Sequence, residues 1–329
     1  MQCAARFMLA LWLVAMPHFA AAQPQTAGTP PQYPAKTIRM LAGFPPGGGV
    51  DSLARLFGQK FGETWGHNVI VDNRTGAGGN IATDIVAKAV PDGHTLLLAV
   101  SSLAINPSLY KIPYDTEKDL APISLLTVAP KIIVAHPSLP VQSLRELAAL
   151  AKSKPGQLTY ASPGSGQASH LAMELFAQMT GTKFIHVPYN GGGPSIVAAL
   201  AGQTQLLTGA LPTLMPHVRS GKLKALAVTS PQRTQLAPDV PTVAEGASLP
   251  GYAADVWYGM LAPAGTPAAI VNKLNAEIAR LLLQRDVRDR FAALGFEPNR
   301  GSPAEFGALI KSDIVKWARV VRESGARVD

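Results

Sequence analysis

The sequence is almost free of cysteine. Its 329 residues contain one, Cys3, close to the N-terminus. A single cysteine excludes an intramolecular disulfide and the multi-cysteine zinc sites of small metal-binding domains, and a chain that loses its N-terminus on export has no cysteine nucleophile either. Stability must therefore come from the burial of apolar side chains, and the chain is long enough to form two domains with substantial cores.

Long apolar runs and aromatic side chains are also scarce. No stretch after the N-terminal segment reaches the roughly 18 apolar residues that a membrane-spanning helix needs. Aromatic residues make up 6% of the chain, and the 29 Lys and Arg residues, which outnumber the 21 Asp and Glu residues, are scattered rather than interleaved with stacking side chains. This distribution argues against nucleic-acid binding, whereas the net positive charge favours anionic ligands.

The first 22 residues have the pattern of a secretory signal peptide. Arg6 precedes an apolar run over 7–15, and three alanines ending at Ala22 supply the small residues of a cleavage site. We therefore expect a periplasmic protein, cleaved near Ala22, with no segment left to insert into a membrane. Residues 23–34 are rich in Pro, Thr, Gln and Gly, which indicates a flexible leader.

Short runs of β-forming residues alternate with stretches of helical period along the rest of the chain. This alternation predicts an α/β protein whose mainly parallel sheets are flanked by helices. In one predicted helix, 51–65, apolar residues recur at intervals of three and four and mark a face that packs on a sheet: Leu53, Leu56, Phe57, Phe61 and Trp65. After a predicted strand at 255–261 the chain continues with three predicted helical segments, which must pack on an existing sheet.

This order of elements predicts two lobes. Residues 35–130 form the first part of lobe one, residues 131–254 form lobe two, and residues 255–329 return to lobe one with the C-terminal helices. The chain then crosses between the lobes twice, near Pro130 and near Asp255, and two crossings make a hinge. A cleft between two lobes is where small ligands usually bind.

Five loops, each between a predicted strand and a predicted helix and four of them rich in glycine, are the most informative feature. They span 43–51, 73–80, 101–107, 162–167 and 189–194. Ligands of open α/β sheets bind beyond the carboxyl ends of the strands, and the N–H groups at the start of a helix favour an anion, so we expect the loops to converge on a carboxylate. The hydroxyls available beside these N–H groups are those of Ser101, Ser102, Ser162 and Ser165. Asp51 or Ser52 is expected to cap the helix after the first loop.

The same loops lack the motifs of common enzyme and cofactor sites. The first has no lysine where a phosphate-binding Walker loop needs one, and the second has Ile81 where a dinucleotide fingerprint has its third glycine. No GxSxG nucleophile motif surrounds Ser165, and no histidines have the spacing of metal ligands. We therefore expect no catalysis, no cofactor and no metal.

Two other functions stay open at this point. A periplasmic serine hydrolase places a loop serine hydroxyl within about 3 Å of a histidine ring nitrogen, whereas a receptor is expected to oppose helix N-termini without such a pair. His170, four residues before Glu174, either touches the ligand or packs within its helix. A ligand-sensing domain that is not coupled to transport has the same sequence features as a transport receptor.

Short motifs that run through nearly the whole chain after the leader carry a family resemblance. They lie at 33–34, 44–51, 73–80, 91–96, 121–124, 136–138, 187–189, 221–229 and 262–267. Together they resemble the Bug-type substrate receptors of tripartite tricarboxylate transporters. The resemblance implies a type II periplasmic-binding-protein fold without catalytic activity, a small di-, tri- or aromatic carboxylate as ligand, and the membrane components of such a transporter as partners. The protein is expected to be a monomer.

The resemblance also implies a set of site residues, because relatives of this kind hold the ligand carboxylate through the first and third loops, partly by ordered waters. On the lobe-one side these residues are Phe44, Pro46, Gly47, Gly48, Asp51, Ala77, Gly78, Ser101, Ser102 and Ala104. On the lobe-two side they are Ser162, Gly164, Ser165, Gln167, His170, Tyr189 and Gly191.

One departure from the family pattern concerns charge. Relatives often carry acidic residues at two positions where this chain has Gln205 and Gly209. If the second acid faces the cleft in relatives, it balances a ligand ammonium, and Gly209 leaves that ammonium without a counter-charge. We therefore expect a plain or aromatic carboxylate rather than an amino acid as the ligand, with Gly209 as part of the site.

Overall fold

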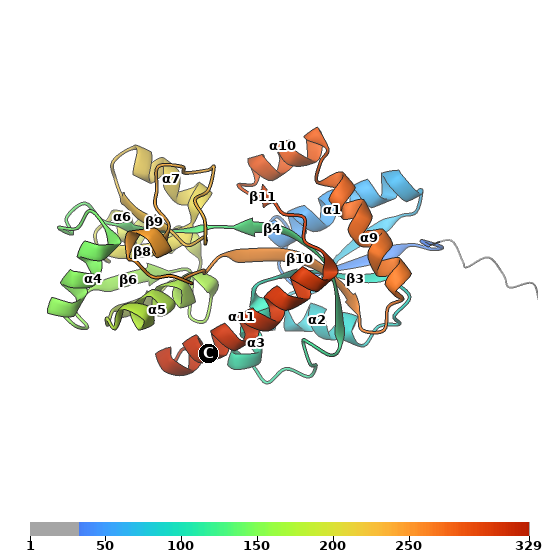
Figure 1. Cartoon of the computed structure of the whole chain (residues 1–329), viewed down its shortest axis with the longest axis horizontal. Coiled ribbons are helices and arrows are strands. Elements are labelled where there is room, and N and C mark those ends of the chain that lie inside the picture. The colour runs from blue at the N-terminus through green and yellow to red at the C-terminus, as the bar shows by residue number, and fades with distance from the viewer. Residues whose placement is uncertain (1–32, 329) are drawn as a thin grey trace, which may run out of the picture. The chain divides into compact units, whose positions relative to one another are not determined.

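The computed structural model describes residues 33–328 (Figure 1). The predicted signal peptide and almost all of the predicted leader lie outside the described residues. The described chain forms two β-sheets with helices packed around them, which confirms the α/β class. No helix within residues 33–328 is both long enough and apolar enough to span a bilayer.

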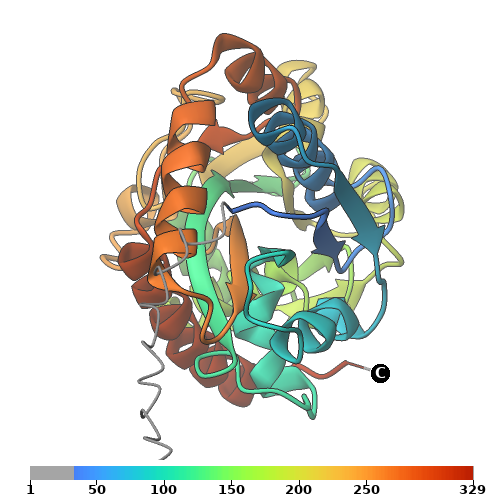
Figure 2. The same cartoon turned by 90° about the vertical axis from the view of Figure 1, so that its right-hand side faces the viewer.

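The first sheet has six strands in the order β11-β4-β10-β3-β1-β2. They are β1 (Ile38–Ala42), β2 (Val69–Asn73), β3 (Thr95–Val100), β4 (Leu120–Ala129), β10 (Val256–Pro263) and β11 (Glu297–Pro298). The helices of this half are α1 (Gly49–Trp65), η1 (Ala77–Gly79), α2 (Asn80–Ala87), α3 (Ser102–Leu109), α9 (Ala268–Leu281), α10 (Arg285–Ala293) and α11 (Pro303–Ser324). Figure 2 shows the early helices, in blue and cyan, on one side and the late helices, in orange and red, on the other.

The second sheet has five strands in the order β7-β6-β8-β5-β9. They are β5 (Lys131–Ala135), β6 (Thr159–Ser162), β7 (Ile185–Pro188), β8 (Leu206–Ala210) and β9 (Lys224–Val228). The helices of this half are α4 (Leu144–Ser153), α5 (Ala168–Thr180), α6 (Gly192–Leu200), α7 (Leu211–Arg219) and α8 (Val243–Gly246).

Both sheets are mixed rather than mainly parallel. In the first sheet β1 is parallel to β2 and β3, whereas β10 is antiparallel to β3 and β4. In the second, β6 is parallel to β7 and β8, whereas β5 is antiparallel to β8 and β9. The antiparallel pairs arise where the chain passes between the sheets, because β4 leads out to β5 and β10 brings the chain back beside β4 (Figure 1). A strand that returns beside the outgoing one runs opposite to it.

β4, the longest of the described strands, is missing from the sequence-based prediction. Its pattern is interrupted by Pro122, which has no N–H group to donate. Pro122 pairs with Leu261 next to a shift of register in the β4–β10 ladder. A bulge of this kind is one of the few places in a sheet that accept proline. Pro122 therefore both obscures the strand pattern in the sequence and lies next to the shift of register in the sheet.

The helix after the first loop begins earlier than the sequence suggests. Gly48 is the N-cap residue of α1, so neither Asp51 nor Ser52 caps it. The buried Asp51 carboxylate instead accepts hydrogen bonds from the Gly47 N–H at 2.9 Å and from Asn73 Nδ2 at 3.0 Å. Asp51 therefore ties the first loop to the second. Of the five residues predicted for the apolar face of this helix, Leu53, Phe57 and Phe61 are fully buried, whereas Leu56 and Trp65 are partly buried.

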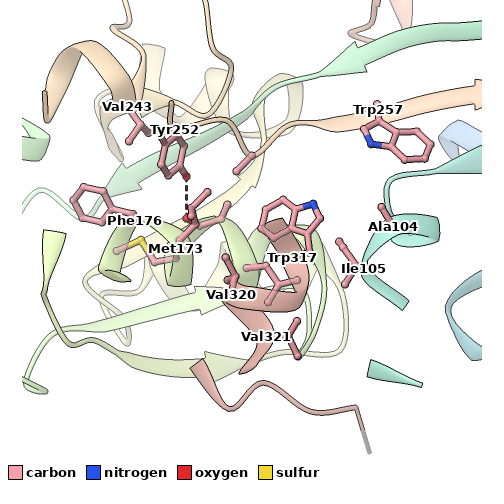
Figure 3. Close-up of a cluster of buried hydrophobic side chains, with 14 of the residues drawn as sticks. Ala104, Ile105, Met173, Phe176, Val243, Tyr252, Trp257, Trp317, Val320 and Val321 are labelled. Atoms are coloured by element: carbon pink, nitrogen blue, oxygen red, sulfur yellow. Dashed lines mark hydrogen bonds between the residues drawn. The ribbon is translucent and has the colours of Figure 1, made fainter. Parts of the chain in front are cut away.

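The largest cluster of buried apolar side chains contains residues from both halves. Trp257 of β10 packs edge-on against Phe306 of α11, and its Nε1 donates a 2.8 Å hydrogen bond to Asp313. Figure 3 shows Trp317 of α11 in the same cluster, with Ile105 of α3 near it. Since α11 contacts both α3 and α5, it joins the first half to the second.

Candidate functional site

A cavity of about 760 Å³ opens where the glycine-rich loops of the two halves meet. Each of the five predicted loops contributes at least one residue to its wall. The predicted site residues in the wall are Phe44, Gly78, Ser101, Ser102, Ser165, Gln167 and Gly209.

The other predicted site residues lie beside the cavity but outside its wall. Exposed at the tips of the first two loops are Pro46, Gly47, Gly48 and Ala77. Buried behind the wall are Asp51, Ala104, Ser162 and His170. The remaining ones are Gly164, Tyr189, which packs against the apolar cluster of the second half, and Gly191, the N-cap residue of α6.

Four helices begin at the cavity: α3, α5, α6 and α7. Their first residues or N-cap residues in the wall are Ser102 for α3, Ala168 and Ser169 for α5, Gly192 and Gly193 for α6, and Ala210 for α7. None of the four has a side-chain cap or an acidic residue in its first turn. The free N–H groups and the positive ends of the helix dipoles therefore remain available to an anion.

Other helices of the chain do have caps. Ser143, Thr242 and Ser302 cap α4, α8 and α11, and each of these helices has a glutamate in its first turn. The sequence thus supplies side-chain acceptors to these three helix starts and supplies none to the four at the cavity. Because α1, α2, α9 and α10 also lack a side-chain cap, it is the convergence of four uncapped starts on one cavity that favours an external acceptor there.

The second and third loops are fixed to each other in the wall. The Gly78 carbonyl oxygen accepts hydrogen bonds from Ser102 Oγ and from Asn106 Nδ2, both at 3.0 Å. Asn106 Nδ2 also donates to Asn80 Oδ1 at 2.7 Å. Gly78 has a φ of 65°, and a Cβ there would lie 3.1 Å from Asn106 Oδ1, so glycine is required. The start of α3 is therefore positioned before a ligand arrives.

Within the part of the chain that the structure describes, Lys131 is the only charged residue that lines the cavity. It is the first residue of β5 and is partly buried. Burial lowers the pKa of its ammonium group to about 8, and the negative charge of Asp255 acts in the opposite direction. Because no carboxylate of residues 33–328 lines the cavity, a ligand ammonium finds no counter-charge among these wall residues.

A serine–histidine pair lies behind the fourth loop. Ser162 Oγ is 2.7 Å from His186 Nε2. The expectation that a receptor has no such pair is therefore wrong. However, Ser162 is fully buried and outside the cavity wall, and its hydroxyl also bonds to the Gly164 carbonyl oxygen at 3.1 Å. Burial lowers the pKa of His186 to about 4. The hydrogen bond between Ser162 and His186 therefore connects the fourth loop to β7.

His170 packs within the second half instead of facing the cavity. Its Nδ1 accepts a 3.0 Å hydrogen bond from the Gly166 N–H, and its ring stacks on His186 with centroids 3.8 Å apart. Burial, followed by the proximity of His186, lowers the pKa of His170 to about 3. The neutral ring therefore holds the Gly166 turn in the cavity wall from behind.

One face of α3 is part of the wall that loop-based reasoning misses. Ser102, Ile105, Asn106 and Leu109 follow the spacing of a single helix face, and Tyr110 continues it. The signal exists in the sequence, but it requires knowing that the helix starts at Ser102. The other wall residues outside the prediction are Val100, Lys131, Pro163, Gly166, Ala168, Ser169, Gly192, Gly193, Ser195, Ile196, Leu207, Ala210, Thr213, Val256 and Val328.

Comparison with known proteins gives one consistent family. Residues 53–326 match the family described as the tripartite tricarboxylate transporter family receptor. BugT of Bordetella pertussis is 40% identical over 310 residues, which cover 93% of this chain and 94% of BugT.

Two solved structures are also similar. Rpa4515 of R. palustris with adipate is 32% identical at a TM-score of 0.73, and covers 90% of this chain and 100% of that one. MatC of Rhodopseudomonas palustris with bound malate is 34% identical at a TM-score of 0.69, with coverages of 88% and 100%. Since the family match spans most of the chain, the chain belongs to the tripartite tricarboxylate transporter receptor family.

Proposed function

We propose that this protein is a periplasmic receptor that captures a small carboxylate in the cavity and delivers it to the membrane components of a tripartite tricarboxylate transporter. The observation that carries the proposal is the convergence of four uncapped helix starts on one cavity. Main-chain N–H groups and the hydroxyl of Ser101 hold the carboxylate, whereas Ser102 Oγ keeps its bond to the Gly78 carbonyl oxygen, and the shape of the cavity selects the rest of the ligand.

The proposal extends to compartment and assembly. Family membership and the N-terminal signal pattern support export to the periplasm with cleavage near Ala22. Relatives solved with adipate and with malate support a carboxylate as the ligand. All five loops of the cavity come from one chain, which supports a monomer as the binding unit.

A hinge at the two connections between the sheets is part of the proposal. The hinge joins two lobes. The first consists of residues 35–130 together with residues 255–329, and the second consists of residues 131–254. Thr229 links the two connections, because its Oγ1 accepts from the Lys131 N–H at 2.9 Å and bonds to Asp255 Oδ1 at 3.1 Å. We expect both connections to bend together when the lobes close on the ligand.

Catalysis is not part of the proposed function. A hydrolytic serine must reach the substrate carbonyl, and Ser162 is buried behind the loop. The wall serines have other partners or none: Ser102 Oγ donates to Gly78 and Ser195 Oγ to Gly192, and no wall serine forms a hydrogen bond to a histidine within the described residues. Family membership favours transport over ligand sensing alone.

Titration with matched pairs of acids and amides tests the proposal. We expect dicarboxylates, tricarboxylates or aromatic acids to bind the mature protein, and their uncharged amides to bind at least about tenfold more weakly, since an amide loses the charge that the helix starts stabilise. Isothermal titration calorimetry measures both affinities, and a ligand-dependent rise in melting temperature provides a second readout.

A cavity-filling variant is the control for the location of binding. Gly193 lies in the cavity wall and a Cβ there meets no heavy atom within 4 Å, so we expect Gly193→Phe to narrow the cavity without a clash at its Cβ. We expect it to melt at the parent temperature without ligand and to lose acid binding. Acid binding that survives in Gly193→Phe, or equal affinity for acids and amides in the parent, would contradict the proposal.

The preference against amino acids rests on Gly209. We expect the parent to bind glutarate more tightly than glutamate, which differs by one amino group, because the wall offers that ammonium no carboxylate. Gly209→Asp supplies one, although its Cβ would lie 2.9 Å from Cδ1 of the buried Leu214, so the Leu214 side chain must shift to make room. The glutarate-to-glutamate affinity ratio should fall by about tenfold in this variant.

Gly209→Asn is the matched control, because it has the same shape without the charge. We expect it to keep the ratio of the parent within about twofold. Calorimetric titration of the three proteins with both acids decides the question. The same preference in Gly209→Asp as in the parent would show that charge at this position does not select the ligand.

A further inference from the structure

The charge in the cavity wall is asymmetric. Four helix starts suit one anionic group, and Lys131 adds a full positive charge to the same wall. A single carboxylate held by main-chain donors does not need that charge. Much of the remaining wall is apolar, with Val100, Ile105, Leu109, Ile196, Leu207 and Val256. The wall therefore combines two features that attract anions with an apolar lining.

The backbone of Lys131 is hydrogen-bonded, whereas its side-chain ammonium group forms no hydrogen bond within residues 33–328. Its N–H donates to Thr229 Oγ1 and its carbonyl oxygen accepts from the Thr229 N–H, both at 2.9 Å. Its ammonium group has no hydrogen bond or ion pair with any residue of the described chain. Lys316, by contrast, pairs with Asp313 at 2.7 Å and donates to the Ala253 carbonyl oxygen at 3.0 Å.

Asp255 is the acidic residue whose charge acts on Lys131, but its hydrogen bond is with another residue. Asp255 shares a hydrogen bond with the Thr229 hydroxyl and forms no ion pair with Lys131 within the described residues. Burial lowers the pKa of Lys131 to about 8, so the group is mainly charged at neutral pH yet poorly solvated. A partly desolvated charge without a partner is unfavourable, and an anion from the ligand relieves it.

We propose that Lys131 binds a second anionic group of the ligand, so that the preferred ligands are acids with two negative groups joined by an apolar spacer. One group binds at the helix starts, the other at Lys131, and the spacer lies against the apolar wall. This inference rests on the proposed function, because it assumes a carboxylate in the same cavity. The inference predicts that a diacid binds more tightly than a monoacid with the same number of carbon atoms.

Lys131→Met tests the inference with a side chain of similar length and no charge. Adipate and hexanoate have the same carbon chain and differ by one carboxylate. We expect the parent to favour adipate by at least about tenfold, and Lys131→Met to lose about 10- to 100-fold in adipate affinity while hexanoate affinity changes by less than about threefold. Isothermal titration of the full mature chain at pH 7 measures the four constants.

Two further variants separate the local charge from other effects. Lys131→Arg keeps a positive charge at the site and should retain the preference for adipate. Lys111→Met removes an exposed lysine outside the wall and controls for the loss of net charge. We expect its preference to match the parent, because exposed charges are screened by salt.

The pH dependence of the parent protein provides a readout that needs no variant. As the pH rises above about 8, free Lys131 loses its proton, and adipate affinity should fall by up to about tenfold per pH unit while hexanoate affinity stays within about twofold. This measurement decides the matter if Lys131→Met does not fold, which its melting curve shows.

The outcomes separate the two proposals. An unchanged adipate-to-hexanoate ratio in Lys131→Met, or a flat pH dependence for adipate in the parent, overturns the role of Lys131 and leaves the carboxylate receptor intact. Failure of every acid to bind the parent overturns both. The inference is supported if Lys131→Met loses the preference for adipate while Lys131→Arg and Lys111→Met keep it.

Discussion

Acidification from pH 6.5 to pH 4 is expected to lower the free energy of unfolding by about 3 to 5 kcal/mol through two buried histidines. Burial lowers the pKa of His186 to about 4 and that of His170 to about 3, from an ordinary value of 6.5. For His186 alone, the gap between 6.5 and 4 corresponds to about 3 kcal/mol. The two rings stack on each other, so their effects are not simply additive.

The sign follows from where the protons bind. Between pH 6.5 and 4 the unfolded chain binds protons on both histidines and the folded chain resists them. The stabilisation is therefore fully present above pH 6.5 and is lost as the pH falls through about 4 and then 3. Burial raises the pKa of the neighbouring Glu174, which acts in the opposite direction because its protonated form suits the folded state. Two histidines against one carboxyl group leave a net loss in acid.

His186→Gln tests the origin of this loss. The amide keeps an acceptor for the Ser162 hydroxyl and cannot be protonated, so we expect the stability difference between pH 6.5 and pH 4 to shrink by about 2 to 3 kcal/mol. Urea unfolding at each pH measures it. His67→Gln, outside the cluster, controls for the substitution itself. A pH dependence equal in His186→Gln and the parent would show that other groups control the acid sensitivity.

Replacing Gly259 with alanine is expected to destabilise the first half by about 3 kcal/mol. A Cβ at this position of β10 would lie 2.1 Å from Cζ of Phe306 and 2.5 Å from Cε1, which is far inside contact distance. The ring is buried and packs edge-on against Trp257, so it has no room to move away. Only a shift of α11 away from the strand makes space for the methyl group.

A double-mutant cycle shows whether the clash is the cause. Phe306→Leu removes the ring atoms that meet the new Cβ, so Gly259→Ala should cost less in that background, by at least about 1 kcal/mol. Gly193→Ala adds the same methyl group where no heavy atom lies within 4 Å and should change stability by no more than about 1 kcal/mol. Denaturant unfolding compares the four proteins and the control. Additive losses in the cycle would place the cause elsewhere.

The sequence predicts the helices and most strands because burial leaves a periodic pattern. The face of α1 is readable from three aromatic and aliphatic residues spaced by four, and each falls in the core. β4 is not readable, because Pro122 breaks its pattern and the bulge that accommodates it depends on the partner strand. β11 consists of only Glu297 and Pro298, and two residues carry no period.

The site is partly predictable for a similar reason. Glycine density marks four of the five predicted loops, and every one of the five reaches the cavity wall. The third, 101–107, has no glycine, and most of it forms the start of α3 rather than a loop. Ile105 and Leu109 are missed because an apolar residue that faces a ligand looks the same in sequence as one that faces the core. Lys131 is missed because the position of its strand relative to the cavity depends on contacts with residues about a hundred positions away. Ser162 and His186 meet through the parallel pairing of β6 and β7, which no local pattern encodes.

The position of α11 in chain order affects how the molecule is made. Its 22 residues come near the end of the described chain, yet they pack in a cluster that elements of both sheets share. A ribosome synthesises the chain from the N-terminus, so neither half can complete this cluster until the final helix has emerged. Until synthesis is nearly finished, the nascent polypeptide therefore lacks the helix that packs against both halves. This leaves a long interval in which a secretion machinery can bind the chain before it has folded completely.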